Sequence, residues 1–143
     1  MLALHFKIIS EMNTRTFAEI MERFAQIEIS ESFDMIVAIA NGGLVPAGIL
    51  NQRLHLEVKV LRINFKDENQ RPRYESPKLL QPVDFDFKGK KILLVDDRIK
   101  SGSTIVVARE ILKDAKEIKT FAVNGKADYA LFNESCFRFP WMV

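Results

Sequence analysis

The sequence contains a single cysteine and no long hydrophobic run, and each of these two absences excludes a class of protein. Cys136 alone cannot form an intrachain disulfide, so we do not expect a small disulfide-stabilised domain, and a reducing cytoplasm is the predicted location. No apolar stretch approaches the roughly 20 residues that span a bilayer, so we expect no membrane association. The segment 1–9 contains His5 and Lys7 and is too short for a signal peptide.

An excess of charge of one sign is also lacking, because 21 basic residues are balanced by 19 acidic ones and the net charge is +2. This balance argues against a protein that binds nucleic acid, whose binding surface normally carries a clear basic excess. The length of 143 residues suffices for one domain and hardly for two. We therefore predict a single domain over residues 1–143.

Short apolar runs alternate with helical patterns along most of the chain. They predict strands at 35–40, 58–63, 91–95 and 119–123 and helices at about 16–26, 44–54 and 104–112. Strands that alternate with helices predict an α/β fold, in which helices flank a mostly parallel sheet. The aromatic tail at 137–141 is a candidate edge strand.

The stretch between Asn64 and Phe87 departs from this alternation, because it is polar and contains Pro72, Pro77 and Pro82. So long an excursion in a small domain is typical of a functional lid or a disordered segment. A passive surface loop is the alternative.

Two segments that follow predicted strands have unusual composition. Asn41-Gly42-Gly43 follows the strand at 35–40, and the segment from Asp96 to Thr104 follows the strand at 91–95. Ligands of parallel sheets bind beyond the carboxyl ends of the strands, so both segments are candidates for a binding site.

The segment from Asp96 to Thr104 suits a ribose 5-phosphate. The first N–H groups of a helix have no acceptor within the helix and attract phosphate, and Gly102 lets the backbone approach a ligand closely. The hydroxyls of Ser101, Ser103 and Thr104 can donate hydrogen bonds, while the two carboxylates can accept them from sugar hydroxyls. The alternative is that Ser103 merely caps the helix and the aspartates are ordinary loop residues.

Val95-Asp96-Asp97, followed by Ser101-Gly102-Ser103-Thr104, resembles the phosphoribosyl-pyrophosphate (PRPP) signature of type I phosphoribosyltransferases. The segment 40–47, Ala-Asn-Gly-Gly-Leu-Val-Pro-Ala, is similar to the pyrophosphate loop of that family. The resemblance covers about residues 34–141. It implies the family's mostly parallel α/β sheet with a small C-terminal hood segment.

The end of the chain is similar to the xanthine and xanthine–guanine branch of the family. That branch has a lysine after the fourth strand, here Lys126, and an aromatic segment that ends in Pro-Trp, here 137–141. The resemblance therefore implies transfer of the ribose 5-phosphate of PRPP to a 6-oxopurine, with release of pyrophosphate. It also implies Mg²⁺ as cofactor and a homodimer.

The resemblance implies a role for each part of the site. Asp96 and Asp97 would face the ribose hydroxyls and hold Mg²⁺, directly or through water. The 5′-phosphate would bind to Ser101, Gly102, Ser103 and Thr104. The pyrophosphate would be held by the backbone of Asn41, Gly42 and Gly43, and by Arg71 and Arg73 of a closing loop.

For the base, the resemblance implies that Lys126 donates to the exocyclic oxygen of the purine and that Phe137 stacks on its ring. A solvated turn lysine and a core phenylalanine are the alternatives. The resemblance implies that the catalytic residues are Asp96, Asp97 and Lys100. The chain departs from the family pattern at Lys100, because family members usually carry an acidic residue at that position. It also has Asn41 where the family often has a cation.

An ammonium at position 100 cannot accept a proton, and it would favour an anionic ligand. Arg98 and Lys100 both belong to the loop expected to bind phosphate, so anion binding should survive the change. Two hypotheses follow, a purine phosphoribosyltransferase and a non-catalytic, regulatory domain that binds PRPP or a nucleotide. An enzyme acting on another ribosyl phosphate is a third outcome.

Overall fold

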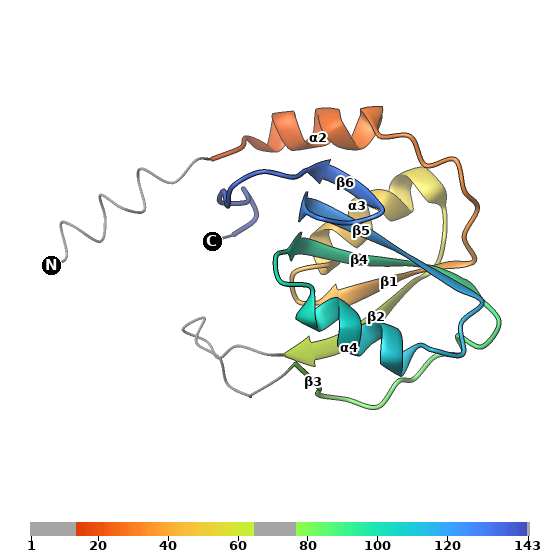
Figure 1. Ribbon diagram of the computed structural model, residues 1–143. Coiled ribbons are helices and arrows are strands. Elements are labelled where there is room, and N and C mark those ends of the chain that lie inside the picture. The colour runs from red at the N-terminus through yellow and green to blue at the C-terminus, as the bar shows by residue number, and fades with distance from the viewer. Residues whose placement is uncertain (1–13, 65–76, 143) are drawn as a thin grey trace, which may run out of the picture.

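The computed structural model describes residues 14–64 and 77–142 and shows a six-stranded sheet between two layers of helices (Figure 1). The strand order is β3-β2-β1-β4-β5-β6. The strands are β1 (Met35–Ala40), β2 (Val58–Asn64), β3 (Lys78–Leu79), β4 (Lys91–Ile99), β5 (Glu117–Gly125) and β6 (Tyr129–Phe132). The helices are α2 (Phe17–Gln26), α3 (Leu44–Leu54) and α4 (Ser103–Ile111). Every pairing is parallel except that of the two-residue β3 with β2.

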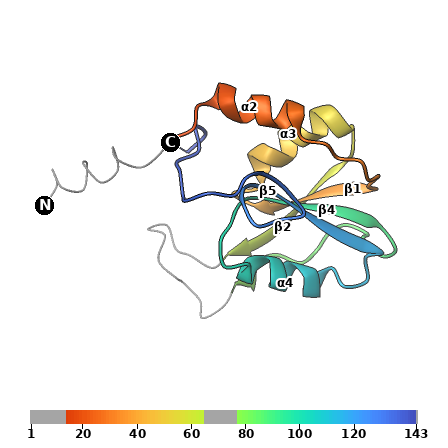
Figure 2. The same ribbon diagram turned by 45° about the horizontal axis from the view of Figure 1, so that its top comes forward.

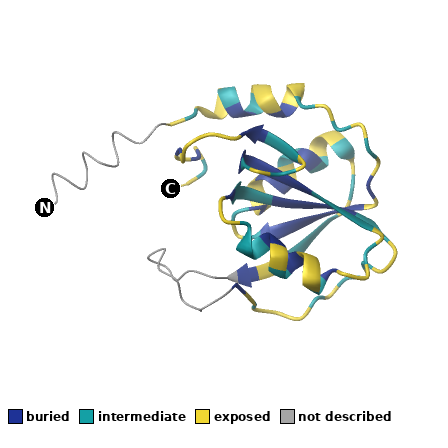
Figure 3. Cartoon of the chain, in the orientation of Figure 1, coloured by how far each residue is buried: buried dark blue, intermediate teal, exposed yellow. Residues whose placement is uncertain are grey.

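The helices cover both faces of the sheet, with α2 and α3 on one side and α4 on the other (Figure 2). Alternate residues of the central strands divide between two cores, as the pleat requires. In β1, Ile36 and Ala38 pack in the core under α2 and α3, whereas Val37 and Ile39 pack in the core under α4. Figure 3 shows the central strands buried and the outer faces of the helices exposed. The α/β class and the mostly parallel sheet are confirmed.

An unpredicted strand, β6, lies beside β5 and runs parallel to it, although only residues 126–128 connect the two. The connection is held by Asp128, whose carboxylate accepts hydrogen bonds from the backbone N–H of Thr120 at 2.8 Å and from its hydroxyl at 3.1 Å. Parallel neighbours usually need a crossover of a dozen residues, so a tight return of this kind gives no ordinary sequence signal.

Residues 133–142, here called the hood, fold over the end of the sheet. Phe137 and Phe139 are fully buried, and their rings pack edge to face with centroids 5.1 Å apart. The predicted edge strand at 137–141 is wrong, since only Arg138 forms a bridge, to Thr14. Within residues 14–64 and 77–142, no helix is both long and apolar enough to cross a membrane.

The amino end of α2 has a reciprocal capping box. The Thr16 hydroxyl accepts from the Glu19 N–H at 3.1 Å, and the Glu19 carboxylate accepts from the Thr16 N–H at 3.3 Å. We expect Thr16→Ala to lower the free energy of unfolding by about 1 kcal/mol, because it leaves a helix N–H without its acceptor. Urea denaturation measures this loss, with the exposed Ser32→Ala as a control expected to stay near wild type. Equal stabilities of the two variants would contradict the assignment.

Candidate functional site

The two carboxylates of the motif lie within a strand, because β4 continues to Ile99 and does not end at Val95 as predicted. Asp96 pairs with Ala122 of β5, and Arg98 pairs with Asn124. Hydrogen bonds between strands join main-chain groups and do not depend on the charge of the side chains. The strand therefore continues through the charged residues to the open end of the sheet. This extension gives the carboxylates a backbone fixed by the sheet.

Asp96 is half-buried beside Asp97 at this end of β4. Burial raises the pKa of Asp96 well above its ordinary value, and repulsion from the Asp97 carboxylate adds to the rise. The Asp97 N–H donates to Asp96 Oδ1 at 2.8 Å, which partly offsets both effects. A carboxyl group in these surroundings gains from a nearby cation.

The loop after β1 packs directly against the two aspartates. A Cβ atom on Gly42 would lie 2.5 Å from Asp97 Oδ1 and 2.9 Å from Asp96 Oδ1, so only glycine allows this approach. A Cβ atom on Gly43 would lie 2.2 Å from the Val95 carbonyl oxygen. The peptide bond between Ala40 and Asn41 is cis. The two segments that the sequence singled out therefore meet at one end of the sheet.

The turn after β4 has the geometry expected of an anion-binding loop. Gly102 has φ 82° and is the N-cap of α4, and it has no side chain with which to cap the helix. Ser103 is the first helical residue, so the alternative in which Ser103 caps the helix is wrong. The hydroxyls of Ser101 and Ser103 are hydrogen-bonded at 2.6 Å, and the half-buried Thr104 follows. The first N–H groups of α4 have no acceptor within the helix.

Arg98 does not point to this turn, contrary to the sequence prediction. Its Nη2 donates to the Phe137 carbonyl oxygen at 2.6 Å, and its guanidinium lies 4.9 Å from the centroid of the Phe139 ring. The side chain thus joins β4 to the hood. Of the two cations predicted in the phosphate loop, only Lys100 is exposed.

Phe137 has no exposed surface and packs between the rings of Phe132 and Phe139. A fully buried ring has no free face on which a base could stack. The stacking role predicted for Phe137 therefore does not fit this structure. Phe137 is a core residue, which was the alternative interpretation of the sequence. Its main-chain carbonyl, by contrast, fixes Arg98.

A cavity of about 170 Å³ lies between the ends of β4 and β5 and the hood. Lys100 and Lys126 both line it and are exposed, which agrees with a ligand-facing position for each. Asn124, which the sequence did not single out, is buried below the cavity. Its side-chain amide donates hydrogen bonds to the carbonyl oxygens of Glu134 and Ser135 and accepts one from the Glu134 N–H. A polar residue directly after the apolar run 121–123 of β5 was the available signal.

Arg62 is a cation that sequence reasoning missed beside the Gly42 loop. It pairs in register with Ala40 at the end of β1, and its guanidinium lies 3.5 Å from the exposed Asn41 amide oxygen. Its place at the carboxyl end of a strand was a usable signal. The predicted pyrophosphate contacts Arg71 and Arg73 lie outside the described residues.

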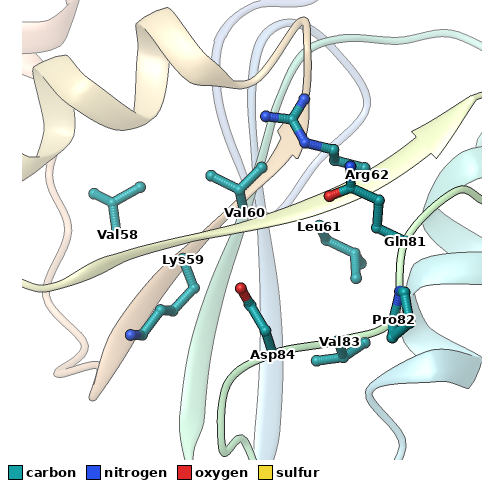
Figure 4. A pocket seen from close by; sticks show the side chains of 9 residues that line it. All are labelled: Val58, Lys59, Val60, Leu61, Arg62, Gln81, Pro82, Val83 and Asp84. Carbon is teal, nitrogen blue, oxygen red and sulfur yellow. The ribbon is translucent and has the colours of Figure 1, made fainter.

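A larger cavity of about 350 Å³ lies along the outer edge of β2 (Figure 4). It is lined by residues 58–62 and by the segment 81–84, and the motif residues do not reach it. Figure 4 shows Arg62 extending away from Asp84 and Lys59. The residues of the two motifs therefore lie at the carboxyl end of the sheet and not at the larger cavity.

The donors at this end of the sheet fit Mg²⁺. Asp96 and Asp97 supply oxygen ligands, which this hard cation prefers, and the backbone of Gly42 lies close to both carboxylates. Among the described residues no group of three or more acidic, histidine or cysteine side chains could hold a metal. Mg²⁺ commonly takes one or two carboxylates and completes its shell with water and ligand phosphates, so two carboxylates suffice.

Comparison with protein families matches residues 10–139 to the phosphoribosyl transferase domain. A xanthine-guanine phosphoribosyltransferase of Idiomarina loihiensis is 26% identical over 119 residues, which cover 78% of this chain and 73% of that protein. A ribose-phosphate pyrophosphokinase of Thermococcus kodakarensis is 36% identical over 76 residues, which cover 52% of this chain and 27% of that protein.

Among solved structures, a purine phosphoribosyltransferase from Pyrococcus horikoshii superposes with a TM-score of 0.72 at 28% identity. The match covers 90% of this chain and 92% of that one. Similarity in both sequence and structure therefore extends over nearly the whole chain, including the strand ends that carry the candidate site.

Proposed function

The chain belongs to the phosphoribosyl transferase domain family, as its two motifs predicted, and on this premise we propose that it transfers the ribose 5-phosphate of PRPP to a 6-oxopurine base. Pyrophosphate is the second product. We propose further that the chain acts as one domain. The homodimer and the cytoplasmic location stay predictions.

The observation that carries the proposal is the close packing of Gly42 against Asp96 and Asp97. It brings the loop proposed for pyrophosphate next to the carboxylates proposed for ribose, and the turn before α4 follows on the same strand. A ribose that carries phosphate at one end and pyrophosphate at the other needs three such regions close together. The arrangement supports PRPP as the ligand.

Each region has a proposed task in the reaction. The turn at 101–104 holds the 5′-phosphate through backbone N–H groups and hydroxyls. The glycine loop holds the pyrophosphate through its backbone, and Arg62 is a further candidate contact in addition to Arg71 and Arg73. Mg²⁺ bound near Asp96 and Asp97 would neutralise charge on the departing pyrophosphate.

The base is proposed to enter the cavity between the strand ends and the hood. Lys126 donates to the exocyclic oxygen of the base. A ring nitrogen of the base attacks ribose C1′ as the C1′–oxygen bond to pyrophosphate breaks, the pyrophosphate leaves with the electron pair, and the ring proton of the base passes to solvent. The hood, held to β4 through Arg98, keeps water away from C1′, where hydrolysis would compete with transfer.

A second candidate function is a non-catalytic domain that binds PRPP or a nucleotide. The observation that favours it is Lys100, which lines the cavity at a position where the resemblance leads one to expect a proton acceptor. The backbone regions proposed for the two phosphate groups do not depend on position 100. Binding would therefore persist without turnover.

Pyrophosphate release separates the two functions. The full chain is incubated with PRPP, Mg²⁺ and one purine at a time, and PRPP binding is measured by calorimetry. Release with one of the bases is the expected result. Tight PRPP binding with no release from any base would favour the regulatory domain, and activity that appears only in Lys100→Asp would point the same way. The absence of both binding and release would overturn both functions.

A further inference from the structure

The ends of β4 and β5 place two lysines close together. Ile99 pairs with Gly125 across the two strands, and Lys100 and Lys126 are the residues that follow. Gly125 has φ 143°, and a Cβ atom there would lie 2.2 Å from the Ile99 carbonyl oxygen, so the strand ends are in close contact. Both lysines line the cavity of about 170 Å³.

The acidic side chain that lines this cavity, Glu134, is paired with an arginine. Its carboxylate accepts hydrogen bonds from the Arg15 guanidinium at 2.7, 2.8 and 2.9 Å. This pairing draws the negative charge toward α2. In the described part of the chain, neither Lys100 nor Lys126 forms an ion pair.

The remaining polar groups at the cavity do not balance the two ammonium groups. Arg98 adds positive charge, although its guanidinium is directed to the hood. Asn124 and Asn133 are neutral, and Cys136 contributes an exposed thiol. The cavity thus has an excess of positive charge, which favours a ligand that is negatively charged where it enters.

We propose that this cavity selects the base in its anionic form, so that a heterocycle with an acidic ring N–H is preferred over one that stays neutral. The proposal rests on the function proposed above, because it names the ionisation state of the base in the same site. Lys100 is then a specificity-determining residue, and Lys126 shares the charge of the bound ring.

Selection of an anion also accounts for the missing proton acceptor. An anionic base has already lost a ring proton to solvent before it binds. When its nitrogen forms the bond to ribose C1′, the C1′–oxygen bond to pyrophosphate breaks, and the pyrophosphate leaves with the electron pair. The nucleotide is thus formed with a neutral base, so the protein has no proton to remove and needs no carboxylate at position 100. A ring with a second acidic N–H, such as that of xanthine, then ionises again in solvent.

Nucleotide binding tests this proposal without turnover. Xanthosine and inosine 5′-monophosphates share the sugar phosphate, but the xanthine ring ionises at a lower pH than the hypoxanthine ring. Calorimetric titrations of the full chain with each nucleotide from pH 5 to pH 9 are compared. We expect the xanthosine nucleotide to bind at least about tenfold more tightly at neutral pH, a preference that disappears in acid.

Lys100→Gln is the decisive variant, and the exposed Lys116→Gln is its matched control, at the turn between α4 and β5. The preference is expected to fall to less than about twofold in Lys100→Gln and to persist in Lys116→Gln, because only the first loses a cavity charge. Equal binding of both nucleotides by the wild type, or an unchanged preference in Lys100→Gln, would overturn the inference and leave the proposed function standing. A preference without pyrophosphate release would overturn the enzyme and keep the inference, whereas binding of neither nucleotide would overturn both.

Discussion

Replacing Gly42 with alanine is expected to lower PRPP-dependent pyrophosphate release about 100-fold or more while the chain still folds, because small displacements of reacting groups are costly. The added methyl group would meet Asp97 Oδ1 at 2.5 Å and Asp96 Oδ1 at 2.9 Å, so one or both carboxylates must move. Gly42 does not have a positive φ, so the effect comes from this contact and not from backbone strain. Initial rates give the loss, and thermal unfolding reports the fold.

Gly48 offers a matched control in the helix that follows. A Cβ atom at Gly48 would meet nothing within 4 Å, and the residue is exposed in α3. Gly48→Ala should therefore keep its activity and gain about 0.5–1 kcal/mol of stability, because alanine restricts the unfolded chain and suits a helix. Wild-type turnover in Gly42→Ala would show that the loop after β1 and the carboxylates do not act together.

Replacing Phe139 with alanine is expected to lower the free energy of unfolding by about 3–5 kcal/mol, the usual cost of emptying a buried aromatic position. The Phe139 ring is fully buried, and it packs against Phe137, Trp141 and the guanidinium of Arg98. Its loss would loosen the hood from β4 as well as leave a cavity. Denaturant unfolding measures the change.

Phe17 is the corresponding exposed phenylalanine, with 51% of its surface accessible in α2. Phe17→Ala should stay within about 0.5 kcal/mol of wild type, as surface substitutions usually do. A loss below about 1 kcal/mol in Phe139→Ala would mean that the hood is not part of the packed core.

The sheet and the meeting of the two loops could be predicted from sequence, because both depend on local patterns. The buried runs at 35–40 and 91–95 indicated strands, and parallel strands bring their carboxyl ends to one edge. The ends of these elements could not be predicted as well. Asp96, Asp97 and Arg98 look like loop residues, yet pairing with β5 extends the strand through them to Ile99.

The direction of individual side chains was the part that sequence could not supply. Phe137 and Phe139 alternate with Arg138, so a pattern of period two places both rings on one face without saying whether that face meets a ligand or the core. Arg98 likewise has a charge that suits a phosphate, but its partner is a carbonyl 39 residues away. Such contacts are set by tertiary packing.

The packing of the hood gives the protein a built-in optical reporter. Trp141 is the only tryptophan of the chain, and its indole stacks on Phe139 with ring centroids 5.0 Å apart and planes 7° from parallel. Phe139 in turn lies against Arg98, one residue beyond the paired aspartates. Indole fluorescence therefore comes from a single place next to the candidate site, and a ligand that shifts the hood can be titrated by emission alone, without a label.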